Sequence, residues 1–149
     1  MSDHYLQLIP TDPQFQPSPE AAERARHLPA TFTPQADSVT TRFEEQVEFF
    51  HPGSNGSEIH CPACGADASH WWSGAMDTAW ESHFDDLTVT AHCCGASISL
   101  NDLRYDWPAG FGRFVLEARN PNVADLPPNQ LAQLQTTLGC TLRTIWVHI

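Results

Sequence analysis

Hydrophobic and polar positions alternate most clearly over residues 39–50. One parity holds Val39, Thr41, Phe43, Val47 and Phe49, and charged or amide side chains fill most of the other. Such alternation predicts a half-buried strand with one face in water. Only Glu45 interrupts the first series.

Other segments predict three more strands and two helices. The strands are expected at 5–9, 111–118 and 141–149. Ser18 and Pro19 mark one helix start, with serine at the N-cap and proline at the first helical position. Pro127-Pro128 opens the second helix, and Gly139 is placed to end it.

Without residues 51–110, the predicted order is strand, helix, strand, strand, helix, strand. This is the split βαβ order of ferredoxin-like α+β folds. We therefore expect one domain over residues 1–149, with two helices on one face of a four-stranded antiparallel sheet. Residues 51–110 would form a zinc-ribbon-like insert between the second and third strands.

Four of the five cysteines lie in two tight groups within this insert. The first group is CPACG at 61–65, and the second is HCCG at 92–95. Two thiolates on one tight turn can face a single ion. The four predicted metal ligands are Cys61, Cys64, Cys93 and Cys94. A closed set of four thiolates predicts structural zinc, because it leaves no position for water or substrate.

The second cysteine group departs from the regular spacing. A regular C-x-x-C-G turn would have its first cysteine at position 91, where Ala91 stands. Adjacent side chains on a strand point to opposite faces, so Cys93 and Cys94 can both bind only if the backbone turns there. The fourth ligand is therefore expected to be Cys93 or His92, with His60, His70 or His83 as weaker substitutes.

Two interpretations of the cysteines without a metal are also open. The four cysteines would then be reduced core thiols, or Cys61 and Cys64 would form a redox dithiol, although the strand-to-helix context of such a motif is missing. Cys140 stands apart and is expected to be a buried core thiol.

A short helix is expected between the cysteine groups, because Trp72, Met76 and Trp80 fall at i, i+4 and i+8. The aromatic side chains of the insert are expected to form its core, a ligand pocket being the alternative; they are Trp71, Trp72, Trp80 and Phe84. Short strands are expected at 87–92 and 96–100.

Residues 101–110 read as a loop that mixes acidic, basic and aromatic groups. The candidate binding residues are Asp102, Arg104, Tyr105, Asp106 and Trp107. Functional side chains are often carried on connections. The competing interpretation is that the two acids cap a turn or pair with Arg104.

The charge balance narrows the classes of partner. Eighteen acidic residues face seven arginines and no lysine, which gives a formal net charge of -11. This charge argues against a general binder of nucleic acid or of an anionic membrane. The N-terminal MSDHYLQLIP has no basic start followed by an apolar run, and no stretch approaches the roughly 20 apolar residues of a membrane span. With an odd number of cysteines, these features predict a cytoplasmic protein.

The motifs CPACG and HCCG resemble those of zinc-ribbon proteins. This resemblance implies a metal-binding role for Cys61, Cys64, Cys94 and Cys93. The longer run, from CPACG through the Trp-rich segment to CCGASISLNDLRYDWPAGF, resembles a family of uncharacterised small bacterial proteins. That second resemblance implies no particular activity.

No H-E-x-x-H, G-x-S-x-G, Walker A or G-x-G-x-x-G motif is present in the sequence. We therefore expect a non-enzymatic cytoplasmic zinc protein that acts by binding another protein. A toxin-neutralising immunity protein is one form of this function, because an acidic patch can steer onto a basic toxin. The alternative is an enzyme or small-molecule-binding protein that uses residues 101–107 next to the metal insert. The sequence identifies neither the partner nor the oligomeric state.

Overall fold

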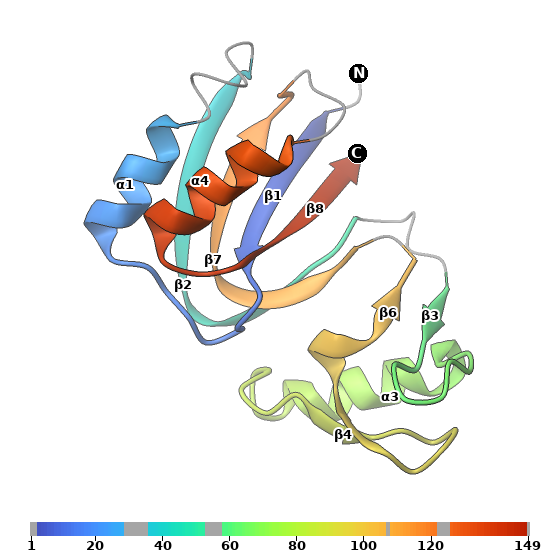
Figure 1. The fold of residues 1–149 in the computed structure, drawn as a ribbon. Coiled ribbons are helices and arrows are strands. Elements are labelled where there is room, and N and C mark those ends of the chain that lie inside the picture. Colours follow the sequence, from blue (N-terminus) through green and yellow to red (C-terminus); the bar gives the residue numbers. More distant parts are fainter. Residues whose placement is uncertain (1–2, 29–35, 53–57, 107, 122–125, 149) are drawn as a thin grey trace.

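The computed structural model of the chain has an antiparallel sheet with two helices and a smaller unit beyond one end of the sheet (Figure 1). It describes residues 3–148 apart from 29–35, 53–57, 107 and 122–125. In chain order the elements are β1 (His4–Pro10), α1 (Pro19–His27), β2 (Ser38–Phe50), β3 (Ile59–His60), α3 (Ser69–Trp80), β4 (Thr88–Thr90), β5 (Ser97–Ser99), the short 3₁₀ helix η1 (Leu100–Asp102), β6 (Arg104–Tyr105), β7 (Gly110–Arg119), α4 (Pro128–Leu138) and β8 (Leu142–His148).

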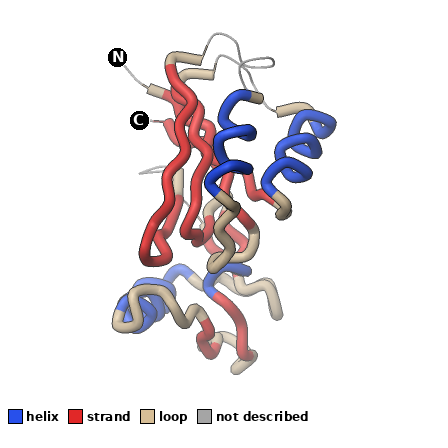
Figure 2. Tube along the Cα trace, turned by 90° about the vertical axis from the view of Figure 1, so that its left-hand side faces the viewer, coloured by secondary structure: helices blue, strands red, loops and turns tan. Residues whose placement is uncertain are grey.

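Four strands form the main sheet in the order β2-β7-β1-β8, and every neighbouring pair runs antiparallel. Leu8 in β1 lies opposite Leu116 in β7 on one side and Thr144 in β8 on the other. Helices α1 and α4 both cover the same face of this sheet (Figures 1 and 2). The predicted α+β class is confirmed.

The larger core lies between this face and the two helices. Its fully or nearly fully buried members include Leu6, Leu8, Ala22, Ala25, Phe114, Leu116, Ala118, Leu134 and Leu138. A second cluster contains Ile9, Phe50, Val115, Ile145 and Val147. Strands β1, β7 and β8 therefore bury apolar side chains on both of their faces.

The predicted helix ends are found where the sequence indicates them. The Ser18 hydroxyl accepts a hydrogen bond from the backbone N–H of Ala21 at 3.1 Å, which caps α1. Helix α4 ends at Gly139, whose φ of +79° is a left-handed conformation that glycine adopts without a steric penalty. None of the helices in the described ranges has the length and apolar character needed to cross a membrane.

Strand β2 bulges at the position where its alternation fails. Phe43 lies opposite Phe114, and Glu48 lies opposite Gly112, so residues 44–47 stand against Arg113 alone. The Glu44 carbonyl oxygen accepts hydrogen bonds from the Gln16 side chain at 2.9 Å and from Arg113 Nε at 3.3 Å. These two bonds hold the bulge in place, because they satisfy a carbonyl that has left the strand ladder.

Between β2 and β7 the chain forms a smaller unit, called the insert from here on. It contains α3 and two two-stranded sheets, β3–β6 and β4–β5. Its apolar cluster includes Trp71, Leu87, Leu100 and Leu103, and also Phe111 from the main sheet. The prediction of a loop over residues 101–110 is wrong in part. The segment begins in η1, and its residues 104–105 form β6, which pairs with β3.

The buried side of α3 differs from the predicted one by a single position. The helix buries Trp71 and Ala79, and not the predicted Trp80, which is 53% exposed. Ala79 allows the backbone of α3 to approach the rest of the insert, whereas a second indole on that side would hold it away. The expectation that Trp80 belongs to the core is therefore wrong.

A buried polar side chain joins the insert to the sheet. Asn101 is only 5% exposed, and its Oδ1 accepts hydrogen bonds from the Phe111 N–H at 2.9 Å and from Arg143 Nη1 at 3.0 Å. Its Nδ2 donates to the carbonyl oxygen of Thr11 at 3.0 Å. Gly110 is needed beside this network, because a Cβ there would lie 2.5 Å from Arg143 Nη1.

Candidate metal centre

Two turns of the insert have the same backbone hydrogen bonds, offset by 30 positions in the chain. In the first turn, the Cys61 N–H donates to the Ala66 carbonyl at 2.9 Å, and the Gly65 N–H donates to the Cys61 carbonyl at 2.8 Å. In the second turn, over residues 91–96, the corresponding bonds measure 2.9 and 2.7 Å. The HCCG segment therefore folds as a turn of the same kind as CPACG, although its cysteine spacing differs.

Each turn closes on a glycine in the left-handed region. The φ angles are +77° at Gly65 and +75° at Gly95. Any other residue with a side chain is strained in this conformation, which explains why glycine follows the last cysteine of both motifs.

The two turns bring four cysteine sulfurs together. The Sγ atoms of Cys61, Cys64, Cys93 and Cys94 all lie within 4.8 Å of one another. Two of the separations are 3.3 Å between Cys64 and Cys93 and 3.9 Å between Cys61 and Cys94. Four sulfurs placed tetrahedrally at about 2.3 Å from one ion are about 3.8 Å apart. The group of four predicted ligands could therefore hold a metal ion.

The chain direction changes at the second motif, and this resolves the problem of the adjacent cysteines. Residues 92–94 form a turn and not a regular strand, so the sulfurs of Cys93 and Cys94 both reach the group. The imidazole of His92 instead stacks on the indole of Trp71, with ring centroids 5.9 Å apart and an interplanar angle of 18°. Of the two candidates for the fourth ligand, the geometry brings Cys93 into the group.

The ionisation of these thiols depends on their neighbours. Backbone N–H groups of Cys64 and Ala63 donate to the Cys61 sulfur and, despite its burial, lower the pKa of Cys61 to about 7. The Cys64 sulfur and burial raise the pKa of Cys93 to about 12. Four thiolates at this separation repel one another, so a bound cation is what allows all of them to lose their protons.

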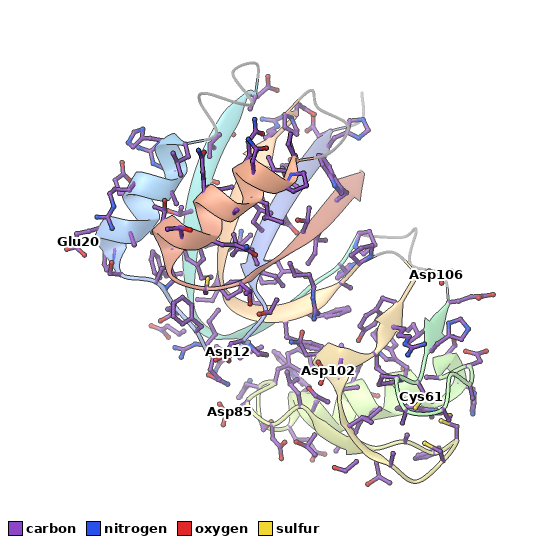
Figure 3. All side chains as sticks on the ribbon, viewed as in Figure 1. Asp12, Glu20, Cys61, Asp85, Asp102 and Asp106 are labelled. Carbon is purple, nitrogen blue, oxygen red and sulfur yellow. The ribbon has the colours of Figure 1, made fainter. Side chains whose placement is uncertain are left out.

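The cysteine group lies at the end of the insert away from the main sheet (Figures 1 and 3). Cys61 is completely buried within the apolar cluster of the insert, while Cys64 and Cys94 are exposed. A metal ion here would tie the segment after β3 to the hairpin β4–β5. The arrangement is that of a cross-link between segments distant in the chain.

The predicted binding residues of 101–107 do not converge on this centre. Asp102 and Arg104 are exposed, on either side of Leu103, and Trp107 lies outside the described residues. The Tyr105 hydroxyl donates to the Leu100 carbonyl at 2.9 Å and accepts from Trp72 Nε1 at 3.3 Å, so it is part of the packing of the insert. Burial raises the pKa of Tyr105 to about 12.

Asp106 belongs to a second, exposed group of three side chains. One carboxylate oxygen of Asp106, one of Glu58 and a ring nitrogen of His60 all lie within 4.8 Å of one another, so this set could also hold a metal ion. The Asp106 N–H donates to the Glu58 carbonyl at 3.0 Å, which brings the two acids together at the end of the β3–β6 pair. In Figure 3, Asp106 and Asp102 lie apart, so the two predicted acids do not share one site.

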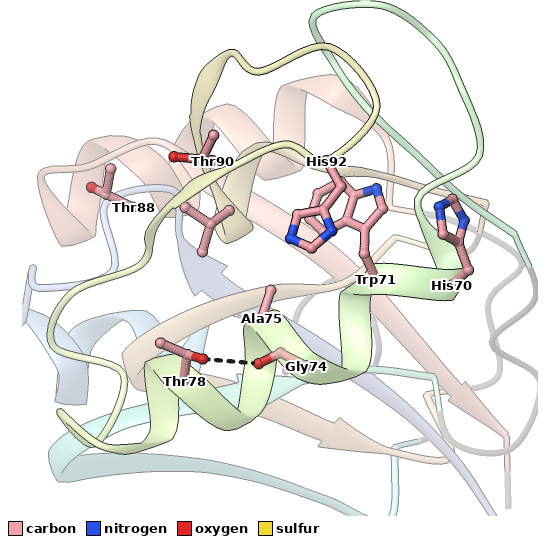
Figure 4. A pocket seen from close by; sticks show the side chains of 9 residues that line it. His70, Trp71, Gly74, Ala75, Thr78, Thr88, Thr90 and His92 are labelled. Carbon is pink, nitrogen blue, oxygen red and sulfur yellow. Dashed lines mark hydrogen bonds between the residues drawn. The ribbon is translucent and has the colours of Figure 1, made fainter.

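A groove of about 680 Å³ lies between α3 and β4 (Figure 4). It is lined by His70, Trp71, Gly74, Ala75, Thr78, Thr88, Val89, Thr90 and His92. The Nε1 atom of Trp71 is buried and has no hydrogen-bond partner among the described residues. Sequence reasoning missed this groove, since its walls come from segments whose packing no local pattern specifies.

No family model, curated protein or solved structure matches the chain. The nature of the centre therefore rests on the chain's own residues and their geometry. The resemblance of CPACG and HCCG to zinc-ribbon motifs stays a prediction.

Proposed function

We propose that the protein binds one structural zinc ion through Cys61, Cys64, Cys93 and Cys94, and that it acts by binding another protein. The observation that carries the proposal is the convergence of four sulfurs within 4.8 Å on two matching turns. Sets of four sulfurs in tetrahedral geometry bind zinc or iron, and zinc is the common ion in turns of this kind.

A structural role for the ion is supported by the closure of the site. Four protein ligands complete a tetrahedron, so neither water nor substrate has a coordination position. Cys61 is a member of the insert's apolar cluster, and structural zinc contributes roughly 10–16 kcal/mol to folding in small metal-dependent units. Zinc would thus stabilise the insert that α3, β4 and β5 form.

A ferredoxin-like fold is the framework that we propose for this insert. Support comes from the strand order β2-β7-β1-β8, in which α1 leads from β1 to β2 and α4 leads from β7 to β8. The insert then interrupts the connection between the second and third strands of the split βαβ pattern. By analogy with insertions into other scaffolds, it presents a binding surface on a rigid sheet.

Protein binding is the function class that the charge supports best. The net charge of -11 opposes phosphate ligands such as nucleic acid and favours a basic protein partner. An immunity-type contact with a basic toxin is one form of this function. The cytoplasm is the compartment we propose, since reduced cysteines are required for metal binding.

Elemental analysis of untagged protein tests the metal part of the proposal. We expect one zinc per chain in the wild type, and loss of zinc together with a lower melting temperature in a Cys61→Ser, Cys94→Ser double variant. Cys140→Ser is the matched control, because this fifth cysteine lies outside the group of four. Wild-type protein without metal but with a full set of titratable thiols contradicts the zinc assignment.

The enzyme alternative makes a different prediction. If Asp102 and Asp106 bind a ligand, then Asp102→Asn and Asp106→Asn should change ligand binding and leave the melting temperature unchanged. A protein partner bound equally by the wild type and by these variants supports the binding-module proposal over the enzyme.

A further inference from the structure

Both large hydrophobic side chains that are exposed in the described part of the chain line the same groove. They are Phe43, which is 41% exposed, and Trp80, which is 53% exposed. This β2–α3 groove has a volume of about 720 Å³ and lies between the β2 bulge and the end of α3. It is lined by Phe43, Glu44, Glu45, Gln46, Val47, Glu48, Phe49, His51, Met76, Trp80 and Phe84.

Irregular backbone lies on both sides of the groove, although Met76 and Trp80 line it from the regular helix α3. One wall is the bulge at residues 44–47, and bulges commonly redirect side chains beside binding sites. The other wall follows α3, where His83 and Phe84 have φ angles of +54° and +60°. Two consecutive non-glycine residues in this region each cost about 1–3 kcal/mol, a strain that occurs preferentially at functional sites.

The strained turn places aromatic rings together at the groove. The ring centroids of Trp80 and Phe84 are 5.3 Å apart in an edge-to-face arrangement. Phe84 contacts Phe111 at 5.2 Å between centroids, which anchors it in the apolar cluster of the insert. Trp80 thus packs against an anchored ring, and its indole faces the groove and solvent.

The groove also carries carboxylates, which attract a positively charged ligand. Arg42 pairs with Glu44 and with Glu48, so these two acids already have a cationic neighbour. Glu45 also lines the groove and is exposed, and its carboxylate has no hydrogen-bond or ion-pair partner in the described part of the chain. The groove therefore combines an exposed indole with an uncompensated negative charge.

We propose that the β2–α3 groove binds a lysine or arginine side chain on a basic segment of a partner protein, between the Trp80 indole and the Glu45 carboxylate. A cation over an indole face is attracted by the electrons of the ring, and tryptophan is the best aromatic residue for this contact. The overall charge of -11 adds long-range attraction for a basic partner. This inference deepens the proposed function and rests on its claim that the protein binds a protein.

The test measures how the protein binds a fluorescein-labelled nonapeptide in which arginine and serine alternate. Fluorescence anisotropy in physiological salt is the readout. The control peptide carries citrulline in place of arginine, which keeps the shape and removes the charge. The protein variants are Trp80→Ala, Glu45→Gln and Glu81→Gln. Glu81 is the matched control, because it is an exposed acid next to Trp80 that does not line the groove.

We expect Trp80→Ala and Glu45→Gln each to weaken arginine-peptide binding by about fivefold, from the usual strength of cation–π and charge contacts. Glu81→Gln should stay within about twofold of the wild type, and the citrulline peptide should not bind. Equal losses in Glu45→Gln and Glu81→Gln would mean that the peptide senses only the net charge, which overturns the proposal. Absence of arginine-peptide binding to the wild type overturns it as well.

Sedimentation velocity on the wild type and on Trp80→Ala tests the competing occupant, a second copy of the chain. A wild-type dimer that becomes a monomer in Trp80→Ala would assign the groove to self-association and contradict the proposal. Zinc content and melting temperature are measured on every variant. If the proposal for the groove fails, zinc content and melting temperature stay unchanged. If the proposed zinc-stabilised fold fails, the failure appears in these two measurements alone.

Discussion

Ala91 takes the place in the second metal-binding turn that Cys61 takes in the first. Each residue donates its N–H to the carbonyl five positions later and accepts from the glycine four positions later. Both side chains are almost completely buried, at 1% and 0% exposure. The two turns are thus equivalent in backbone, and the second one supplies its extra sulfur from Cys93.

This equivalence predicts that the ligand can be moved. In an Ala91→Cys, Cys93→Ala double variant the four sulfurs return to the regular C-x-x-C-G spacing, so we expect one zinc per chain and a melting temperature close to that of the wild type. Cys93→Ala alone leaves three sulfurs and should bind zinc at least tenfold more weakly. Competition with a zinc chelator measures both. Equal zinc affinities for the single and the double variant would contradict the equivalence of the turns.

Replacement of Asn101 should destabilise the whole chain. Asn101→Ala removes three hydrogen bonds at a buried position. The Phe111 N–H and the Thr11 carbonyl lose their side-chain partner, and Arg143 Nη1 loses one of its acceptors. Unsatisfied buried groups of this kind cost about 2–4 kcal/mol in the free energy of unfolding. Urea unfolding measures the loss, and Asp102→Ala, an exposed neighbour, should change stability by about 0.5 kcal/mol or less.

Tyr105 should ionise unusually late in an alkaline titration. Its pKa is raised from 10.0 to about 12 by burial, so the folded state favours the neutral phenol. The stability from this preference is complete below pH 10 and is lost as the pH rises through 12. Tyrosinate absorbance of the wild type minus that of Tyr105→Phe should rise near pH 12. A midpoint near pH 10 would show that the hydroxyl is not buried.

Removal of the metal should loosen the insert before the sheet. The main sheet and its helices have an apolar core of their own, whereas the cysteine group joins segments of the insert alone. Hydrogen exchange with and without a chelator should show protection lost in α3, β4 and β5 and kept in β1 and β7. Uniform loss of protection across both units would contradict a local role for the metal.

Local patterns were sufficient to predict most elements of the sheet unit. Ser18, Pro19 and Gly139 mark helix ends through their own backbone chemistry, and the structure confirms each of them. The break in alternation at Glu45 coincides with the bulge, although it did not reveal how many residues leave the ladder. These features need no information from distant parts of the chain.

Features that depend on distant contacts could not be predicted in this way. Asn101 binds groups from Thr11 and Arg143, which lie far away in sequence, so nothing in its own loop distinguishes it from Asp102. The buried side of α3 depends on how closely the helix packs, and helical spacing alone fits the stripe of Trp80 as well as that of Ala79. The two cysteine motifs could be grouped because their spacing carries chemistry.

X-ray absorption at the zinc edge of the purified protein tests the central claim most directly, because it counts the atoms bound to the metal. The proposal predicts four sulfurs at about 2.3 Å and no oxygen or nitrogen ligand. Three sulfurs and one imidazole nitrogen would mean that a histidine, and not Cys93, is the fourth ligand. Three sulfurs with a water oxygen at about 2.0 Å would describe an open site, which contradicts a purely structural zinc and favours the enzyme alternative.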